Sequence, residues 1–311
     1  MNKKEYIPPA VVEKPEKKLP KPYLITRIGA SFLDFLMIFI IFAGFEALTY
    51  FTLFEPLGYH ALIDEAHQVL SDSHLYSYDS AKGYSTITEA YNEDLTPEEN
   101  YDVPIVYYYS QDARALQNDR LALYYNEKTT STYFVEESEG IFARAGNATD
   151  DEIRTFLASE YDKAIAFLED DPVYLNGIQK SFYIVIFSVL INATLATGII
   201  HLLIPMLMKN GQTPFKLVFK LALVDNRDET RAKRWQIVVR FSILISFNIW
   251  IPILLFAKFT YFTLIPVFAT IIMMSLTKTY SGPHDYFSKT YIVSSRDITI
   301  PESQSIIESD S

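Results

Sequence analysis

Long apolar stretches separated by polar segments dominate the pattern along this chain. Residues 23–52 and 180–208 are each apolar for long enough to cross a bilayer as a helix, which takes about 20 residues. Residues 237–276 form one more apolar run, and a single helix of that length would extend about 60 Å, twice the hydrocarbon thickness. Two spans, 237–256 and 259–277, joined by a turn near residues 252–258, fit the thickness of a bilayer better than one helix does. The pattern therefore predicts an all-α polytopic membrane protein with four transmembrane helices.

The first of these spans is interpreted as a retained anchor. Its apolar stretch is far longer than the central region of a signal peptide, and no cleavage site of the small-x-small kind follows it.

Between the first two spans, residues 57–178 have the pattern of a separate α+β domain. Apolar positions recur with helical spacing across 62–70, and Thr149 with Glu152 forms the capping-box pattern that begins a helix. Residues 102–108 and 132–135 are rich in β-branched and aromatic types and are predicted to be short strands. The acidic residues of this insert show no dense metal-ligand spacing, so a solvated acidic face is favoured over a divalent cation site.

Charge is segregated along the chain, and this sets the expected topology. The formal net charge is −11, yet residues 57–178 carry 24 acidic and 7 basic residues, whereas the rest carries 14 and 20. Basic segments favour the cytoplasmic side, so we expect a multi-pass protein of the cell membrane with both termini inside and the insert extracytoplasmic. The predicted segments are the disordered basic tail 1–22, spans 23–52 and 180–208, the outer domain 57–178, the cytoplasmic loop 209–236, spans 237–256 and 259–277, and the cytoplasmic tail 278–311.

The residue content excludes several classes of function. The chain has no cysteine, so it has no disulfide, thiolate metal site or cysteine nucleophile, and this composition favours a bacterial source. Basic residues flank the spans rather than form one surface, so we expect no nucleic-acid partner. There is no nucleophile elbow, HExxH motif or phosphate loop, so we expect neither enzymatic activity nor a cofactor.

Charged residues at the cytoplasmic ends of the spans are the candidate site. Arg27 and Asp34 are seven residues apart and so share a helix face, with small residues between them. A carboxylate within a span needs a partner, so we predict that Asp34 pairs with Arg27 or Arg240 and that Asp285 closes the same cluster. His201 and His284 complete the set: His201 lies near the cytoplasmic end of the second span, where a packed histidine is favoured over a proton relay, and His284 directly precedes Asp285.

These residues resemble the signature of the RDD family, whose name refers to one arginine and two aspartates. The matching positions are Arg27, Asp34 and Asp285, and the loop 211–214, which reads Gly-Gln-Thr-Pro, is also similar to the family's. The resemblance covers roughly residues 23–54 and 180–293 and leaves the acidic insert aside. Phe215 departs from it, because the family usually has glycine there. Membership implies a membrane protein with suggested roles in transport, including ion–proton antiport.

Two classes of function remain open. In the first, the Arg/Asp residues mediate cation–proton exchange or small-solute transport, for which four spans are few, so a homo-oligomer would be required. In the second, the cluster is a structural lock in a non-transporting scaffold, whose acidic outer domain contacts a partner or whose spans join a larger membrane complex. In both, the lipid bilayer surrounds the spans.

Overall fold

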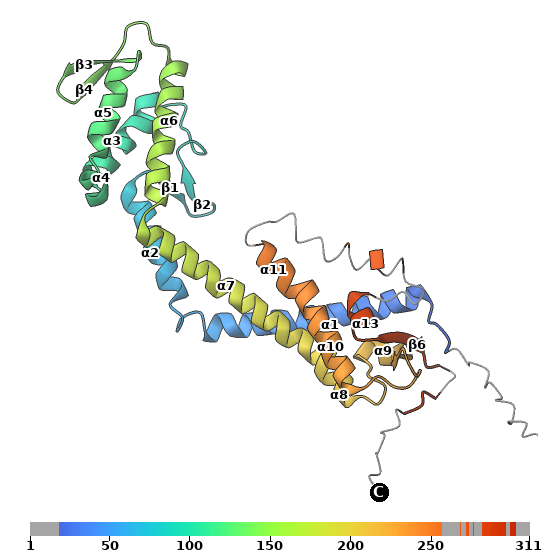
Figure 1. Ribbon diagram of the computed structural model, residues 1–311. Coiled ribbons are helices and arrows are strands. Elements are labelled where there is room, and N and C mark those ends of the chain that lie inside the picture. The colour runs from blue at the N-terminus through green and yellow to red at the C-terminus, as the bar shows by residue number, and fades with distance from the viewer. Residues whose placement is uncertain are drawn as a thin grey trace, which may run out of the picture. The chain divides into compact units, whose positions relative to one another are not determined.

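The computed structural model describes residues 19–256, 268, 272–273, 276, 282–296 and 299–302. The chain divides into two compact units, one made of residues 1–49 and 186–311 and the other of residues 50–185. Figure 1 labels helices and strands of both units.

Three described helices are long and apolar enough to cross a membrane: Leu24–Thr52, Pro172–Leu207 and Arg234–Leu254. The first is α1, and its apolar side chains are mostly exposed, as for Phe39 and Ile40. Apolar side chains without protein neighbours on such a helix are the pattern of a lipid-facing surface. The predicted fourth span, 259–277, lies outside the described residues except for four helical positions.

The other two long helices are continuous but irregular. The second consists of α7 (Pro172–Gly198), a π-helical turn (Ile199–Leu203) and α8 (Ile204–Leu207). The third consists of α10 (Arg234–Ile245), a π-helical turn (Ser246–Trp250) and α11 (Ile251–Phe256). The backbone stays helical through residue 256, where the predicted span 237–256 ends, and residues 257 and 258 of the predicted turn lie outside the described residues.

The loop after α8 and the C-terminal segment form a small folded layer that the sequence did not predict. It contains α9 (Pro214–Val218), β5 (Leu221–Asp225), α13 (Pro283–Phe287) and β6 (Thr290–Ser294). Strands β5 and β6 pair antiparallel, with Leu221 opposite Ser294 and Asp225 opposite Thr290. All five residues of β5 are buried. One face of this pair, with Leu221 and Leu223, packs with Ala30 of α1, so the layer is anchored to the first span.

The second unit is a compact α+β domain. Its elements are α2 (Tyr59–Ser73), β1 (Tyr76–Asp79), β2 (Gly83–Thr86), a π-helical turn (Glu98–Asp102), α3 (Val103–Gln111), α4 (Ala113–Gln117), α5 (Arg120–Thr130), β3 (Phe134–Ser138), β4 (Ile141–Arg144) and α6 (Asp150–Glu169). The two hairpins, β1–β2 and β3–β4, form separate two-stranded sheets. The helix predicted over 62–70 and the capping box of Thr149 and Glu152 are both confirmed.

One prediction in this unit is wrong. Residues 102–108 form the end of a π-helical turn and most of α3 rather than a strand. Their aromatic and β-branched types favour a strand locally, but Ile105, Tyr108 and Tyr109 recur at helical spacing and are all buried in one core with α6. Packing of that face outweighed the intrinsic preference. The strand predicted at 132–135 begins two residues later, at Phe134.

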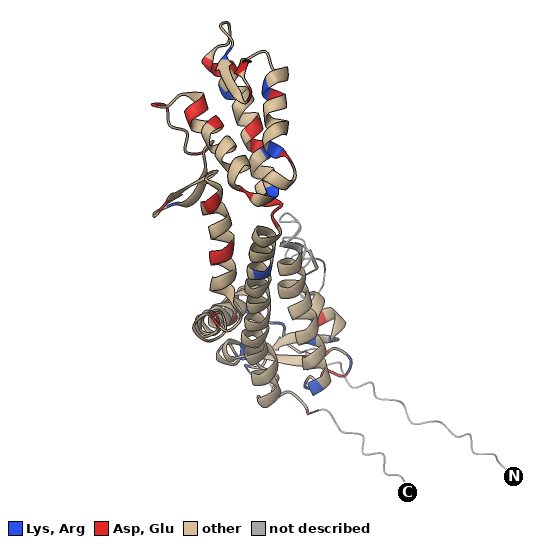
Figure 2. Cartoon of the chain, turned by 90° about the vertical axis from the view of Figure 1, so that its left-hand side faces the viewer, with Lys and Arg blue, Asp and Glu red and all other residues tan. Residues whose placement is uncertain are grey.

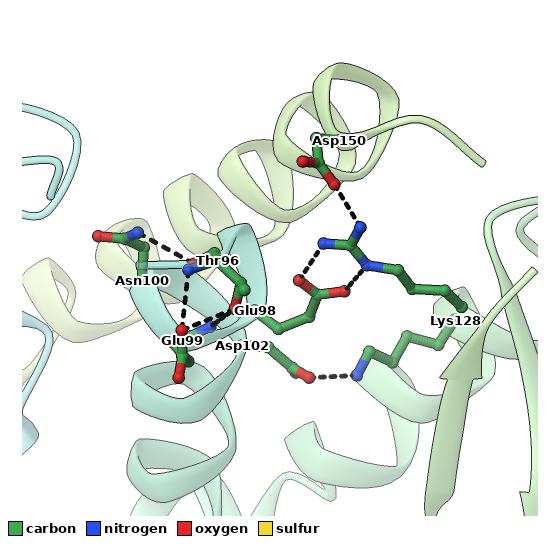
Figure 3. A network of polar contacts seen from close by, with 8 residues as sticks. Thr96, Glu98, Glu99, Asn100, Asp102, Lys128 and Asp150 are labelled. Atoms are coloured by element: carbon green, nitrogen blue, oxygen red, sulfur yellow. Dashed lines mark hydrogen bonds and ion pairs between the residues drawn. The ribbon is translucent and has the colours of Figure 1, made fainter. Parts of the chain in front are cut away.

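A polar network fastens the β3–β4 hairpin to the helices of this unit (Figure 3). Arg144 of β4 binds Glu98 through two N–O contacts of 2.5 and 2.7 Å and also contacts Asp150. Lys128, which is 3% exposed, pairs with Asp102 at 2.7 Å and lies against three aromatic rings. All of these charges have partners within the domain, so the network stabilises the fold.

Candidate functional site

The predicted geometry of the first span is present in α1. Arg27, Ala30 and Asp34 are the buried residues of this helix, and they lie on one face, as the seven-residue spacing requires. Ala30 is fully buried against β5 and its neighbours, which allows the backbone of α1 to approach that layer closely.

Asp285 forms ion pairs with both arginines. Its carboxylate lies 2.8 Å from Nε of Arg240 and 3.5 Å from Nη2 of Arg27, and the three side chains are no more than 10% exposed. They come from α13, α10 and α1, so one carboxylate joins the third helix and the C-terminal segment to the first span. Burial by itself raises the pKa of Asp285, but Arg240, His284 and Arg27 together outweigh it, so the pKa falls below its usual value. Asp285 is therefore ionised at neutral pH.

Asp34 has a different role from the one predicted. Its two oxygens accept hydrogen bonds from the hydroxyl of Thr213 and from the backbone N–H of Phe215 at 3.3 Å. Thr213 is the N-cap residue of α9, and its own side chain does not cap the helix. Asp34 of α1 instead provides an oxygen that accepts a hydrogen bond from a backbone N–H group in the first turn of α9. Its negative charge is also favourable near the positive N-terminal end of the helix dipole. Among the described contacts, Asp34 therefore caps α9 and does not form the predicted pair with Arg27 or Arg240.

The loop that carries α9 is shaped for this contact. Gly211 has φ +57°, a left-handed conformation that glycine adopts without strain. Gln212 then donates from its side chain to the carbonyl of Leu221 at 2.7 Å, which fixes the loop to β5. Phe215, the departure from the family pattern, lies inside α9 with its ring against the Ala30 cluster, so no tight turn is needed at that position.

Two further titratable groups lie outside the spans and face the cluster. Burial lowers the pKa of Lys216 to about 7, with Arg240 adding to the effect and Asp34 and Asp285 opposing it. Burial likewise lowers the pKa of His284 to about 4, against the influence of Asp285. The imidazole is therefore neutral at pH 7, and its 3.7 Å approach to Asp285 is a contact rather than an ion pair.

His201 belongs to the same neighbourhood. It lies in the π-helical turn after α7, where Lys216, Arg240 and His284 are the charged or titratable groups acting on it. The structure thus gathers all six residues singled out in the sequence, and it adds Thr213 and Lys216. The loop motif was the signal for Thr213, whereas Lys216 looked like one more basic residue of a cytoplasmic loop.

Gln236 is another residue that sequence reasoning missed. It is fully buried in the first turn of α10 and donates to the carbonyl of Ser288 at 3.2 Å. It therefore fastens the start of the third long helix to the segment that follows α13. A polar residue at a helix start gives no sequence signal of such a distant partner.

A cavity of about 390 Å³ borders the charge cluster. Arg27, Arg240, His284 and Asp285 line its polar side, and Ile28 and Phe32 belong to its apolar side. In the described part of the chain no group of three or more His, Cys, Asp or Glu residues could hold a metal ion. The arrangement can hold charged helix ends together.

Buried, paired charges at the ends of long apolar helices are the architecture of a helical integral membrane protein. Charged side chains are sparse along the long helices of the first unit, while acidic side chains recur over the helices of the second (Figure 2). The family comparison agrees: residues 155–289 match the model of the RDD family. This match confirms the resemblance to that family, and it includes Arg240 and Asp285, while Arg27 and Asp34 precede it. No curated protein and no solved structure matched the chain.

Proposed function

We propose that this is a multi-pass protein of a bacterial cell membrane with four spans, residues 259–277 being the fourth. Both termini and the loop 209–236 then lie in the cytoplasm, and residues 57–178 lie outside. The excess of basic residues in the segments assigned to the cytoplasm supports this orientation. Single cysteines placed at Ser131 and Thr230 of this cysteine-free chain should react with a membrane-impermeant thiol reagent from opposite sides, Ser131 from outside.

We further propose that the Arg/Asp cluster is a structural lock in a scaffold, and that the outer domain makes the functional contacts. The observation that carries this proposal is the state of Asp34. It is fully buried, and each of its oxygens accepts a hydrogen bond from the α9 region. A carboxylate that exchanges ions must release its partners and be reached by water, whereas a cap must keep them.

The outer domain has a feature suited to a partner of opposite charge. A cavity of about 260 Å³ is lined by Asp72, Asp112 and Asp171, with Tyr108 and Val69 beside them. Asp112 and Asp171 already cap α4 and α7 through hydrogen bonds to backbone N–H groups, which leaves Asp72 as the lining carboxylate that forms no hydrogen bond or ion pair among the described residues. Together with the acidic composition of residues 57–178, this favours a cationic partner surface, with lipid around the spans and a homo-oligomer or larger membrane complex as the assembly.

A second candidate function is cation–proton exchange, and one observation favours it. Lys216 is a buried amine whose pKa of about 7 lets its charge change near neutral pH beside Asp34. The two candidates are separated by proton and cation flux into vesicles that contain the purified protein, measured for the wild type and for Asp34→Asn. The lock predicts no flux in either protein. Flux that is present in the wild type and lost in a stably folded Asp34→Asn protein would overturn the lock.

A further inference from the structure

A polar seam joins α1 and α7 within the two candidate spans, well away from the charge cluster. Ser188 donates its hydroxyl to Oε2 of Glu46 at 2.9 Å. Asn192 donates its amide to the hydroxyl of Thr49 at 2.9 Å and to that of Ser188 at 3.3 Å. Glu46 is twelve residues from Asp34 along α1, or about 18 Å along the helix axis.

The second oxygen of Glu46 differs from the first in its contacts. Oε1 is buried and forms no hydrogen bond among the described residues. Ser188 and Asn192, which flank it, are 8% and 5% exposed, and Glu46 itself is only partly exposed within a candidate membrane span. An ionised carboxylate in a span is costly unless a proton, a cation or a hydrogen-bond donor compensates it. The hydrogen bond from Ser188 serves Oε2 only.

Helix association by itself does not account for this arrangement. Hydroxyl and amide side chains commonly join membrane helices, and Asn192, Ser188 and Thr49 would do so without an acid. A glutamine at position 46 could accept the same hydrogen bond from Ser188. The carboxylate adds a negative charge, and in the described part of the chain no basic side chain forms an ion pair with it.

We propose that Glu46 binds a small monovalent metal cation such as Na⁺, in competition with a proton, with the hydroxyl oxygens of Thr49 and Ser188 completing the site and the Asn192 amide group holding both hydroxyls in place. The ligands are a carboxylate and two hydroxyls, all hard oxygen donors. One carboxylate balances one positive charge, so the occupied site is neutral. A divalent ion would leave a net charge within the membrane, at high cost. This inference is independent of the lock proposed for Asp34.

The test is modification by dicyclohexylcarbodiimide, an apolar reagent that adds to protonated carboxyl groups in membranes. The full-length protein is treated in detergent, in choline chloride or in NaCl of equal ionic strength, and the peptide containing Glu46 is quantified by mass spectrometry. We expect Glu46 to be modified in choline. Na⁺ at about ten times its dissociation constant should slow the modification about tenfold, because only the unoccupied fraction reacts.

Variants make the test specific to the seam. Ser188→Ala and Asn192→Ala keep the carboxyl group, so they should still be modified, but a higher Na⁺ concentration should be needed for protection. Thr194→Val, on the same helix outside the seam, should behave as the wild type. Glu46→Gln should lose the modification, and Na⁺ should then no longer raise the unfolding temperature relative to choline.

Three results would overturn the proposal: equal modification of Glu46 in NaCl and choline, no modification of Glu46 in either salt, or wild-type protection in both seam variants. A seam that only joins helices gives the first of these results, since occupancy by Na⁺ would not change the reactivity of Glu46. Because Ser188→Ala and Asn192→Ala are mild changes, the outcome does not depend on whether Glu46→Gln folds.

Discussion

Asp285→Asn is the sharpest test of the charge cluster, because one carboxylate serves two arginines. The change keeps the size of the side chain and removes the charge that faces Arg240 at 2.8 Å and Arg27 at 3.5 Å. Asp285 is 1% exposed, so the arginines left behind are not readily compensated by water. Removing one partner of a buried ion pair costs about 3–5 kcal/mol. For a unit of this size that corresponds to an unfolding temperature lower by roughly 6–20 °C.

The assay is thermal unfolding of the detergent-solubilised protein, followed by tryptophan fluorescence. The chain has two tryptophans, Trp235 and Trp250, and both lie in the third long helix, next to the cluster or further along the same helix. The signal therefore reports on the first unit rather than on the outer domain.

A second variant separates lost charge balance from lost shape. Asp285→Asn combined with Arg240→Gln returns the net charge of Arg27, Arg240 and Asp285 to its wild-type value of +1, so we expect much of the stability to return. Asp228→Asn, an exposed aspartate of the same unit, is the matched control and should change the free energy of unfolding by less than about 1 kcal/mol. An unfolding temperature for Asp285→Asn equal to that of the control would refute the lock, and so would a double variant less stable than the single one.

Three further predictions concern the neighbouring groups and the outer domain. Asp34→Ala should lower the free energy of unfolding by about 2–4 kcal/mol in the same assay, because α9 loses its cap and the buried Thr213 hydroxyl loses its acceptor; an effect below 1 kcal/mol would show that the cap is dispensable. Lys216→Met should stabilise the protein by up to about 5 kcal/mol at pH 7 or below. This advantage should shrink as pH rises from 7 toward 10.5, because over that range Lys216 is protonated in the unfolded state but not in the folded state. A difference in unfolding temperature between the two proteins that does not change with pH would contradict the assigned pKa. Residues 57–178 expressed alone should unfold cooperatively by circular dichroism, since the core around Tyr101, Leu157 and Tyr161 lies within them; a broad, non-cooperative melt would contradict this.

Local sequence was enough for the features that depend on one helix at a time. The three described spans, the shared face of Arg27 and Asp34 and the capping box at Thr149 follow from apolar length, helical periodicity and side-chain chemistry within a few residues. The basic flanks and the acidic insert likewise gave an expected orientation from charge alone.

The partners of those residues depended on contacts between distant segments. Asp34 meets Thr213 across 179 positions, and β5 pairs with β6 from the far end of the chain. A buried carboxylate must find a donor or a positive charge, so the sequence predicted that Asp34 has a partner, but many candidates satisfy that rule.

Tertiary packing also determined the secondary structure of a segment whose local preference predicts a different element. Residues 102–108 became helical because their buried face fits the core of the outer domain, and that gain outweighs a strand propensity worth at most about 1 kcal/mol per residue. Glu46 is a second case in which local sequence does not reveal the contacts of a residue. In the sequence it is one polar residue near the end of an apolar run, and only the packing of α7 against α1 shows that one of its oxygens is buried without a hydrogen-bond partner among the described residues. Apolar length and periodicity fix which helices form, while burial and partner choice arise only when the helices meet.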